Sequence, residues 1–378
     1  MKIVVDENIP QALEAFGNFG EIILSSGRKI SNKLLSDADI LIVRSITIVN
    51  EDLLKRTKVK FVGTATAGTD HIDIEFLNKN KIAFADAAGC NSYSVAEYFI
   101  SALVQLYKKN NVSLKNKTLG VVGCGNVGSK VARFSKELGL EVLINDPPLE
   151  RKYGSKDFVT IEEILKCDII SLHVPLNLTG IDKTFHLINE ENLKQIKSGT
   201  ILINTSRGEV IENYALKKRL INYADLITVL DVWENEPLID YELLSKVDIG
   251  TAHIAGYSLE GKVNGTEIIY KKLCNFLNVP SSWQPKYPSI PESVITIDTN
   301  KKFEEHFYNI FKEIYKIDDD DKLLREGINF DSELQSKHFD LLRKNYSIRR
   351  EFNNYSIKLT ADNEELKRKF ETLRFKVI

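Results

Sequence analysis

The sequence lacks three features that would each indicate a particular class of protein. Its four cysteines in 378 residues are scattered and form no CxxC pair, which argues against a disulfide framework or a cysteine zinc site. No uncharged apolar run approaches the ~18–20 residues that cross a bilayer. The net charge of −2 gives no electrostatic case for binding nucleic acid or an anionic membrane. We therefore expect a soluble cytoplasmic protein with reduced thiols.

What the sequence does contain is a globular composition with regularly spaced apolar runs. It is 43% hydrophobic and 28% charged, and its length suits two or three domains. Buried parallel strands are indicated by KIVV (2–5), ADILIVRS (38–45) and VKFVGTATA (59–67). A second series between residues 118 and 253 consists of TLGVVG, LEVLIND, CDIISLHV, GTILINTS, LITVLDV and VDIGTAH. Because helix-length segments separate these runs, we expect an α/β fold with two Rossmann-like, doubly wound parallel sheets.

Composition changes along the chain suggest where the domains meet. Residues 92–109, SYSVAEYFISALVQLYKK, carry apolar residues at helical spacing and are long enough to link two domains. Residues 281–293, SSWQPKYPSIPES, hold three prolines in 13 residues and are typical of a linker. We expect residues 286–378 to form a small α+β domain. Within it, the acidic run at 317–322 is interpreted as a solvated loop or helix cap rather than a metal site.

The most specific local motif is GVVGCGNVG, residues 120–128. Gly123 allows a tight turn after a strand, Gly125 lets a pyrophosphate approach the backbone, and Gly128 lets the following helix pack closely. The phosphates then face free N–H groups at the helix N-terminus. Asp146 follows Gly128 by 18 residues, and a carboxylate there can bind both adenosine ribose hydroxyls and repel a 2′-phosphate. The motif predicts NAD rather than NADP as cofactor.

Three ionisable residues follow successive strands of the second series: Arg207, Glu236 and His253. Oxidising an alcohol requires removal of its proton, which a histidine can accept near neutral pH. A carboxylate beside the imidazole would fix its tautomer, and an arginine can grip a substrate carboxylate. Singly, such residues are more often structural or surface charges. Their order after a dinucleotide motif favours catalysis, and no grouping of His, Cys and Asp suggests a metal.

Taken together, these motifs resemble the D-isomer-specific 2-hydroxyacid dehydrogenases over roughly residues 1–275. The family's order is matched by GCGNVG, Asp146, HVP (173–175), INTSRGEVI, LDVWENEP and HIAG. The resemblance implies that Arg207, Glu236 and His253 are catalytic, with His253 as the general acid/base paired with Glu236. His173 would instead line the cofactor pocket, and His71, His186, His306 and His338 are interpreted as structural.

The same resemblance implies a set of NAD-binding positions around the glycine motif and the strand ends. They are Gly123, Gly125, Asn126, Val127, Gly128, Asp146, Val174, Thr205, Ser206, Arg207, Asp231 and Gly256. Asp231 matches a position at the nicotinamide end, and a core-edge carboxylate that caps a neighbouring helix is the open alternative. No metal is implied, because hydride transfer to NAD needs none.

Further segments match one branch of this family, which oxidises 4-phospho-D-erythronate to the 2-oxo acid in pyridoxal 5′-phosphate biosynthesis. They are VDENIP (5–10), VRSIT (43–47), FVGTATAGTDHID (61–73), GCNSYSVAEY (89–98), HIAGYSLEGK (253–262) and LLRKNYSIRRE (341–351). This branch extends the resemblance over nearly the whole chain and implies a homodimer formed through the C-terminal domain. Thr205 and Ser206 stand where most members carry Ala-Cys, a departure that weakens the substrate assignment slightly.

The branch resemblance also implies where the substrate binds. Its substrate-binding positions are Ser45, Thr66 and Tyr257, whose hydroxyls suit a polar ligand. Arg44 is a further candidate for the 4-phosphate because guanidinium matches phosphate geometry. An arginine paired with Asp39 or Glu97 is an equally open interpretation. The sequence leaves open whether the phosphate is instead held by basic residues from a partner subunit, such as Arg343, Lys344 and Arg349.

The expected organisation is a discontinuous lid domain (1–92 with 259–280), an NAD-binding domain (93–258) and a C-terminal dimerisation domain (286–378). Two alternatives remain for the function. Phosphoglycerate dehydrogenase uses the same catalytic groups on a shorter phosphorylated hydroxyacid, although the lid motifs argue against it. An NAD-sensing corepressor or scaffold would keep the fold without turnover, and assaying small hydroxyacids would separate it from an enzyme.

Overall fold

The computed structural model describes residues 1–378 with the exception of 111–113, 115, 155–156, 292 and 301–302. The described chain divides into two compact units. Unit 1 contains Met1–Asn91 and Ser258–Ser289, and unit 2 contains Ser92–Tyr257 and Ile290–Ile378. The three domain ranges expected from the sequence stay predictions.

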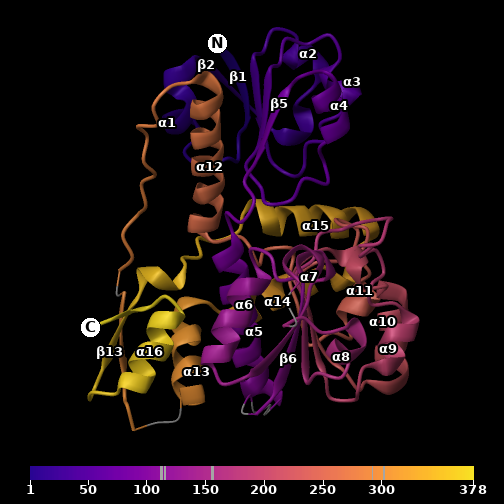
Figure 1. Ribbon diagram of the computed structural model, residues 1–378, viewed down its shortest axis with the longest axis vertical. Coiled ribbons are helices and arrows are strands. Elements are labelled where there is room, and N and C mark those ends of the chain that lie inside the picture. The colour runs from indigo at the N-terminus through magenta and orange to yellow at the C-terminus, as the bar shows by residue number, and fades with distance from the viewer. Residues whose placement is uncertain (111–113, 115, 155–156, 292, 301–302) are drawn as a thin grey trace. The chain divides into compact units, whose positions relative to one another are not determined.

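Unit 1 is built on a parallel sheet with the strand order β2-β1-β3-β4-β5. Its strands are β1 (Lys2–Asp6), β2 (Glu21–Ser25), β3 (Ile40–Val43), β4 (Phe61–Thr64) and β5 (Ala83–Asp86). The apolar runs predicted β1, β3 and β4, whereas β2 and β5 are the edge strands and are less buried. One face packs on α1 (Ala12–Phe16) and α12 (Leu259–Leu277), and the other on α2 (Asn32–Leu35), α3 (Glu51–Leu54) and α4 (Ile74–Lys79) (Figure 1).

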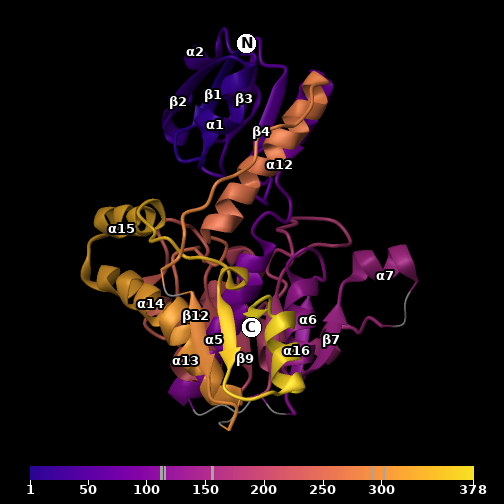
Figure 2. The same ribbon diagram turned by 90° about the vertical axis from the view of Figure 1, so that its left-hand side faces the viewer.

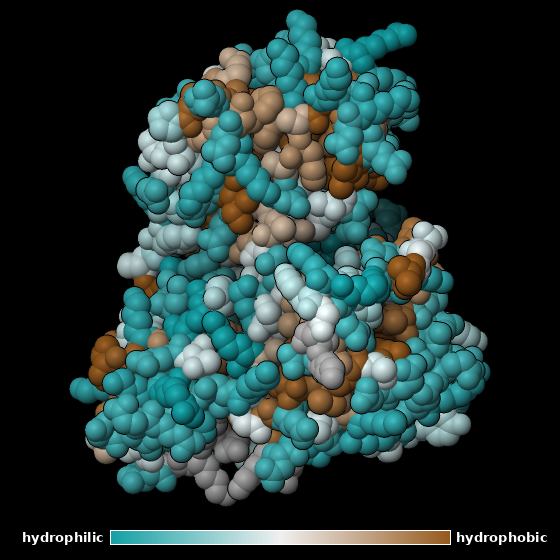
Figure 3. Space-filling view, in the orientation of Figure 1, coloured by the Kyte–Doolittle hydropathy of each residue, from teal (hydrophilic) through white to brown (hydrophobic). Residues whose placement is uncertain are grey.

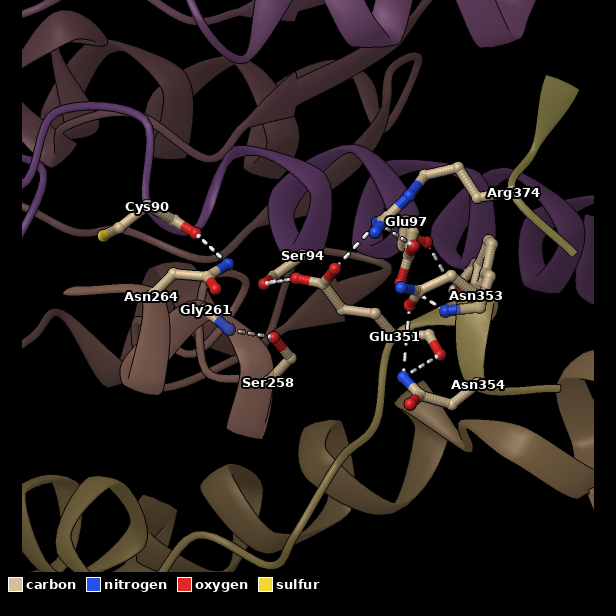
Figure 4. A network of polar contacts seen from close by, with 12 residues as sticks. Cys90, Ser94, Glu97, Ser258, Gly261, Asn264, Glu351, Asn353, Asn354 and Arg374 are labelled. Carbon is tan, nitrogen blue, oxygen red and sulfur yellow. Dashed lines mark hydrogen bonds and ion pairs between the residues drawn. The ribbon is translucent and has the colours of Figure 1, made fainter. Parts of the chain in front are cut away.

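Helix α12 lies far along the chain from the strands of unit 1, and specific contacts fix it there. The side-chain amide of Asn264 donates to the carbonyl oxygen of Cys90 at 3.1 Å, and the Ser258 hydroxyl caps the helix (Figure 4). A Cβ on Gly265 would lie 2.5 Å from the carbonyl oxygen of Ala65. Only glycine therefore lets the helix approach the loop after β4 so closely.

Unit 2 contains a larger parallel sheet with the strand order β11-β10-β9-β8-β6-β7. Its strands are β6 (Thr118–Val122), β7 (Glu141–Asn145), β8 (Ile169–Leu172), β9 (Ile201–Asn204), β10 (Ile227–Leu230) and β11 (Ile249–Gly250). All six match apolar runs predicted from the sequence, and Phe158 forms a further parallel bridge with Ile144 of β7. This arrangement confirms the predicted doubly wound architecture.

Helices cover both faces of the larger sheet, as Figure 1 shows. One face packs on α5 (Ser92–Asn110) and α6 (Gly128–Glu137), and the other on α8 (Ile161–Ile164), α9 (Glu190–Gln195), α10 (Asn213–Tyr223) and α11 (Tyr241–Leu244). The segment predicted to be helical at 92–109 is therefore α5. Because both faces are covered, the strands are apolar throughout rather than alternating.

The C-terminal segment of unit 2 adds a small parallel sheet of order β12-β13-β14. Its strands are β12 (Val294–Ile297), β13 (Ser356–Leu359) and β14 (Lys376–Val377), and its helices are α13 (Phe303–Ile314), α14 (Ile317–Arg325), α15 (Ser332–Lys344) and α16 (Glu364–Thr372). Figure 2 shows α13 and α16 beside α5 and α6, with which they share one core. The segment is thus packed onto the larger sheet's helices rather than separated from them.

The acidic run at 317–322 begins α14 and is not a loop. The Asp321 carboxylate accepts a hydrogen bond from the backbone N–H of Gly250 at 2.7 Å and pairs with Arg325 at 2.9 Å. Asp320 accepts hydrogen bonds from the hydroxyls of Tyr315 and Tyr346. The sequence could not show this, because the partners of these carboxylates come from other segments of unit 2.

The surface agrees with the composition of the chain. Hydrophilic side chains cover most of the face seen in Figure 3, with apolar side chains gathered in smaller patches. Across the described ranges, no helix has the length and apolar character needed to cross a membrane. Among the same described residues, no group of three or more His, Cys, Asp or Glu side chains is placed to hold a metal ion.

Candidate active site

The glycine-rich loop joins β6 to α6 in unit 2. Gly123 has a φ of 86°, and a Cβ there would lie 2.8 Å from the carbonyl oxygen of His173 and 2.9 Å from a methyl group of Val174. A Cβ on Gly128 would overlap the carbonyl oxygen of Gly123, whereas one on Gly125 would meet no atom within 4 Å. The loop is therefore closed on its protein side and open at Gly125, which fits a pyrophosphate resting on the N-terminus of α6.

Asp146 holds the other end of this loop. Its carboxylate accepts hydrogen bonds from the backbone N–H of Cys124 at 2.7 Å and of Leu149 at 3.0 Å, and the second of these caps α7 (Pro147–Tyr153). A carboxylate has acceptor capacity beyond two such bonds, so ribose hydroxyls can still be bound. These residues fit the adenosine half of NAD.

His173 follows β8 and lies beside the glycine-rich loop as a neutral ring. Its Nε2 is 2.8 Å from the Ser171 hydroxyl, and its Nδ1 is 3.4 Å from the Thr205 hydroxyl. Burial lowers the pKa of His173 to about 3. A histidine that stays neutral near pH 7 is poorly suited to exchange protons there. The expectation that His173 lines the cofactor pocket stays a prediction.

His253 and Glu236 form a hydrogen-bonded pair at the carboxyl edge of the larger sheet. The distance from His253 Nδ1 to Glu236 Oε2 is 2.8 Å, and Glu236 Oε1 accepts from the backbone N–H of Trp233 at 3.0 Å. Burial would raise the pKa of Glu236, but His253 and Arg343 hold that pKa below its usual value. The ionised carboxylate therefore accepts a hydrogen bond from Nδ1–H and leaves His253 Nε2 for another group.

The loop that carries His253 is held by Asp231. The two oxygens of the Asp231 carboxylate accept from the backbone N–H groups of Ile254 and Ala255 at 2.7 and 2.9 Å, and Oδ1 also accepts from the Thr251 hydroxyl at 2.6 Å. His253 itself has a φ of 55°, a left-handed conformation that non-glycine residues rarely adopt. Asp231 thus supports a strained backbone at the proposed catalytic base. Its expected contact with NAD stays a prediction.

Two further side chains support this loop, and neither was predicted from the sequence to do so. The hydroxyl of Tyr98, in α5, lies 2.7 Å from the Thr251 hydroxyl. The indole N–H of Trp233 donates to the Thr251 carbonyl oxygen at 2.9 Å. Both side chains are almost fully buried. A tyrosine within an amphipathic helix is indistinguishable from an ordinary core residue until its partner is known.

Arg207 follows β9, and its loop packs directly on the loop that bears Glu236. A Cβ on Gly208 would overlap the backbone of Trp233, so only glycine permits this approach. The Arg207 guanidinium donates to the Ser206 carbonyl oxygen at 2.8 Å, and the Ser206 hydroxyl donates to Asn204 at 2.8 Å. The loops carrying Arg207, Glu236 and His253 are therefore brought together in unit 2, as the order of the motifs predicted.

The other predicted substrate positions lie in unit 1, at the carboxyl ends of neighbouring strands. Ser45 follows β3 and is exposed, and Thr66 follows β4 with its hydroxyl 2.8 Å from that of Thr64. The guanidinium of Arg44 lies 3.3 Å from the carboxylate of Asp6. The suggested pairing of Arg44 with Asp39 or Glu97 was wrong, because β1 and β3 are adjacent and their ends bring Asp6 alongside.

The remaining predicted NAD positions flank these elements. Asn126 and Val127 lie in the turn that opens α6, where the Lys130 ammonium donates to the Asn126 carbonyl oxygen at 2.8 Å. Gly256 precedes Tyr257 in the loop after β11, and the Tyr257 N–H donates to the Ile254 carbonyl oxygen at 2.8 Å. All of these positions belong to unit 2, together with the glycine-rich loop.

Comparisons with known proteins show the family to which the chain belongs. A family model described as "D-isomer specific 2-hydroxyacid dehydrogenase, NAD binding domain" matches residues 101–255, and a domain of unknown function matches residues 288–373. The chain is 44% identical over 369 residues to erythronate-4-phosphate dehydrogenase of Proteus mirabilis, covering 96% of each chain. It is 43% identical to the protein of that name from Tolumonas auensis, covering 97% of each chain.

Solved structures extend the comparison to the fold. An NAD-bound 3-phosphoglycerate dehydrogenase of Entamoeba histolytica is 30% identical, with a TM-score of 0.63 over 74% of this chain and 95% of that one. A D-lactate dehydrogenase of Aquifex aeolicus is 28% identical, with a TM-score of 0.61 over 74% of this chain and 96% of that one. The fold and site define an NAD-dependent D-2-hydroxyacid dehydrogenase. Within that class, the chain belongs to the erythronate-4-phosphate dehydrogenase family.

Proposed function

We propose that the protein oxidises 4-phospho-D-erythronate with NAD to (R)-3-hydroxy-2-oxo-4-phosphooxybutanoate, a step of pyridoxal 5′-phosphate biosynthesis. The observation that carries the proposal is the 2.8 Å hydrogen bond between His253 Nδ1 and Glu236 Oε2. It lies at the carboxyl edge of the sheet that also bears the glycine-rich loop, where open α/β sheets bind ligands. The choice of substrate is supported by relatives named erythronate-4-phosphate dehydrogenase that match nearly the whole chain.

In the forward direction, His253 Nε2 accepts the proton of the C2 hydroxyl, because Nδ1–H is donated to Glu236. The ionised Glu236 fixes this tautomer and stabilises the imidazolium that forms. Arg207 orients the substrate carboxylate and stabilises the negative charge that develops on the new carbonyl oxygen. NAD, when bound, supplies the acceptor for the hydride that leaves C2.

The predicted binding residues complete this proposal. Ser45 and Thr66 supply hydroxyls for the polar substrate from the ends of two neighbouring strands, and Tyr257 supplies a third from the loop after β11. Arg44 is a weaker candidate for the phosphate, since its charge is already offset by the buried Asp6. Asp146 binds the adenosine ribose.

The test is NAD reduction by the full chain with 4-phospho-D-erythronate, 3-phosphoglycerate or D-lactate as substrate. A 2-oxo acid is added in parallel reactions so that a cofactor that stays bound can be reoxidised. Reduction with 4-phospho-D-erythronate at far higher kcat/KM than with the other two supports the proposal. A preference for another acid would overturn the assignment of the substrate. If none of the three acids reduces NAD although NAD binds, the assignment of a dehydrogenase activity would be overturned.

One observation favours 3-phosphoglycerate as a second candidate substrate. The solved 3-phosphoglycerate dehydrogenase from Entamoeba histolytica is 30% identical and shares the fold. That similarity covers 74% of this chain, whereas the relatives named for erythronate-4-phosphate cover about 97%. The same assay distinguishes the two substrates directly.

We also propose that the protein acts as a homodimer in the cytoplasm. Large apolar side chains of the C-terminal segment are exposed, with Leu334 at 49%, Leu341 at 52% and Ile348 at 71%, and such a surface suits a partner subunit. The cysteines, all free, suit a reducing compartment. Light scattering after size exclusion should give a dimer mass, and Leu341→Glu should shift it toward the monomer.

A further inference from the structure

Arg343 lies close to the site although it comes from the C-terminal segment. It stands in the last turn of α15, and its guanidinium carbon lies 5.6 Å from the centre of the Tyr257 ring and 6.0 Å from that of Phe339. Tyr257 is in the loop that carries His253. Arg343 therefore places a cation beside a loop that the proposed reaction uses, from a segment that matches a domain of unknown function.

The charge of Arg343 is only partly satisfied by the protein. Its Nε is buried and has no hydrogen-bond partner in the described part of the chain. Burial would lower the pKa of the Arg343 guanidinium, but the neighbouring Tyr257 and Glu236 raise that pKa above its ordinary value. The side chain thus stays cationic in a setting where an uncompensated charge is unfavourable.

The nearby carboxylates already have other partners. Glu236 accepts hydrogen bonds from His253 and from the backbone of Trp233. Asp231 is occupied by the backbone N–H groups and the hydroxyl of the His253 loop. A ligand anion is therefore the group best able to satisfy the guanidinium, and arginine suits planar, bidentate binding of phosphate.

The residues that follow Arg343 in the chain are held against the loop that carries His253. Tyr346 packs edge-on against Tyr257 with ring centres 5.9 Å apart, and its hydroxyl donates to Asp320 at 2.9 Å. Arg349 is buried and donates to the carbonyl oxygen of Ala255. The segment after α15 is therefore bonded to the loop bearing His253. Such support lowers the entropy lost when a ligand binds.

We propose that Arg343 binds the 4-phosphate of the substrate and so sets the preference for a phosphorylated acid. This proposal rests on the proposed function, because it assigns the end of the substrate that the catalytic groups leave free. His253 must meet the C2 hydroxyl and Arg207 the C1 carboxylate. The phosphate is the one anionic group of the substrate that then lacks a partner. The C-terminal segment would thereby contribute a binding residue as well as packing.

The test measures binding rather than turnover. The NADH-bound full chain is titrated calorimetrically with 4-phospho-D-erythronate and with D-erythronate, using wild type, Arg343→Ala and Arg343→Lys. We expect Arg343→Ala to weaken binding of the phosphorylated ligand by about 10- to 100-fold, the scale of a charged hydrogen bond, with little effect on D-erythronate. Arg343→Lys should restore part of the loss, because it keeps the charge without the bidentate geometry.

Two controls keep the result interpretable. Lys337→Ala removes an exposed cation from the same helix that pairs with Glu333, and it should bind both ligands as wild type does. NADH affinity of each variant reports whether the cofactor domain remains folded. Unchanged affinity of Arg343→Ala for 4-phospho-D-erythronate, or an equal loss for both ligands, would overturn the proposal. If wild type binds the phosphorylated acid yet does not reduce NAD with it, the proposed function fails while the binding comparison still decides the role of Arg343.

Discussion

The two large sheets of the protein share their strand order but differ at the loop that decides cofactor binding. Unit 1 has the order β2-β1-β3-β4-β5, and unit 2 repeats it as β7-β6-β8-β9-β10 before adding β11. The first strand of unit 1 ends at the fully buried Asp6, which pairs with Arg44. The matching strand of unit 2 ends at the apolar Val122, and Gly123 follows it.

The helices that follow these loops differ as well, and the difference again favours dinucleotide binding by unit 2. Helix α1 has five residues and α6 has ten, and α6 begins at Gly128, three residues after Gly125, where a Cβ would meet no atom within 4 Å. A carboxylate where phosphates would lie repels them, whereas glycines leave room and free donors. The two sheets thus share one topology, and the composition of the loop after the first strand decides which of them binds the dinucleotide.

The largest expected effect concerns the carboxyl edge of the larger sheet. His253→Ala or Arg207→Ala should lower kcat by at least ~10²-fold, because each removes a group positioned for proton transfer or charge stabilisation. Steady-state kinetics with 4-phospho-D-erythronate is the measurement. His186 offers a matched control, since it pairs with Glu234 at 2.6 Å outside the proposed site. His186→Ala should keep near wild-type kcat, and a His253→Ala enzyme that does the same would contradict the assignment.

The glycines give the next effect and compare the two units directly. A Cβ on Gly128 would overlap the Gly123 carbonyl oxygen, whereas one on Gly17, after α1, would meet no atom within 4 Å. Gly128→Ala should lower the free energy of unfolding by about 1–3 kcal/mol and weaken NADH binding. Gly17→Ala should be neutral or stabilise by about 0.4–1 kcal/mol, since its φ of −59° suits alanine. Urea unfolding and NADH titration measure both, and equal effects would contradict the comparison.

A smaller effect is expected at Asp146, which follows β7 of the larger sheet. Asp146→Ala should lower the NAD-over-NADP preference by about tenfold, the scale of one lost hydrogen bond to a charged group. Asp146 also caps α7, so the loss of a cap must be separated from the loss of a ribose contact. Asp240 caps α11 in a similar way. Asp240→Ala should leave the cofactor preference unchanged, and an unchanged preference in Asp146→Ala would refute the ribose role.

The sequence predicted the parts of the fold that depend on local patterns. Every strand of the larger sheet was visible as an apolar run, and its inner strands are buried on both faces and apolar throughout. The partly exposed edge strands β2 and β5 were not singled out, whereas β7, an edge strand that is also partly exposed, kept the apolar run VLI. The glycine-rich loop was predictable for another reason. A side chain on Gly123 or Gly128 would clash with backbone nearby in the sequence or at the adjoining strand, and Gly125 leaves open space.

The parts that could not be predicted depend on partners far apart in the sequence. Asp231 was expected to contact the cofactor, and its bonds to Ile254 and Ala255 became visible only in the structure. Arg343 lies beside Tyr257 although the two residues are 86 positions apart in the sequence, and no local pattern predicts this contact. Buried ionic and polar contacts of this kind require the tertiary structure, since any of several charged residues could supply the partner.

The smallest expected effect concerns the residues that follow two matching strands, β3 in unit 1 and β8 in unit 2. Unit 1 has Arg44, paired with Asp6, and unit 2 has His173, whose pKa burial lowers from 6.5 to about 3. Between these two pH values the unfolded chain binds a proton at His173 that the folded chain does not. The free energy of unfolding should therefore fall as pH decreases through this window. His173→Asn removes the titrating group and should reduce that fall by about 1 kcal/mol near pH 5.5. Urea unfolding of both proteins at about pH 7 and pH 5.5 measures the difference, and parallel changes would mean that the ring is solvated rather than buried.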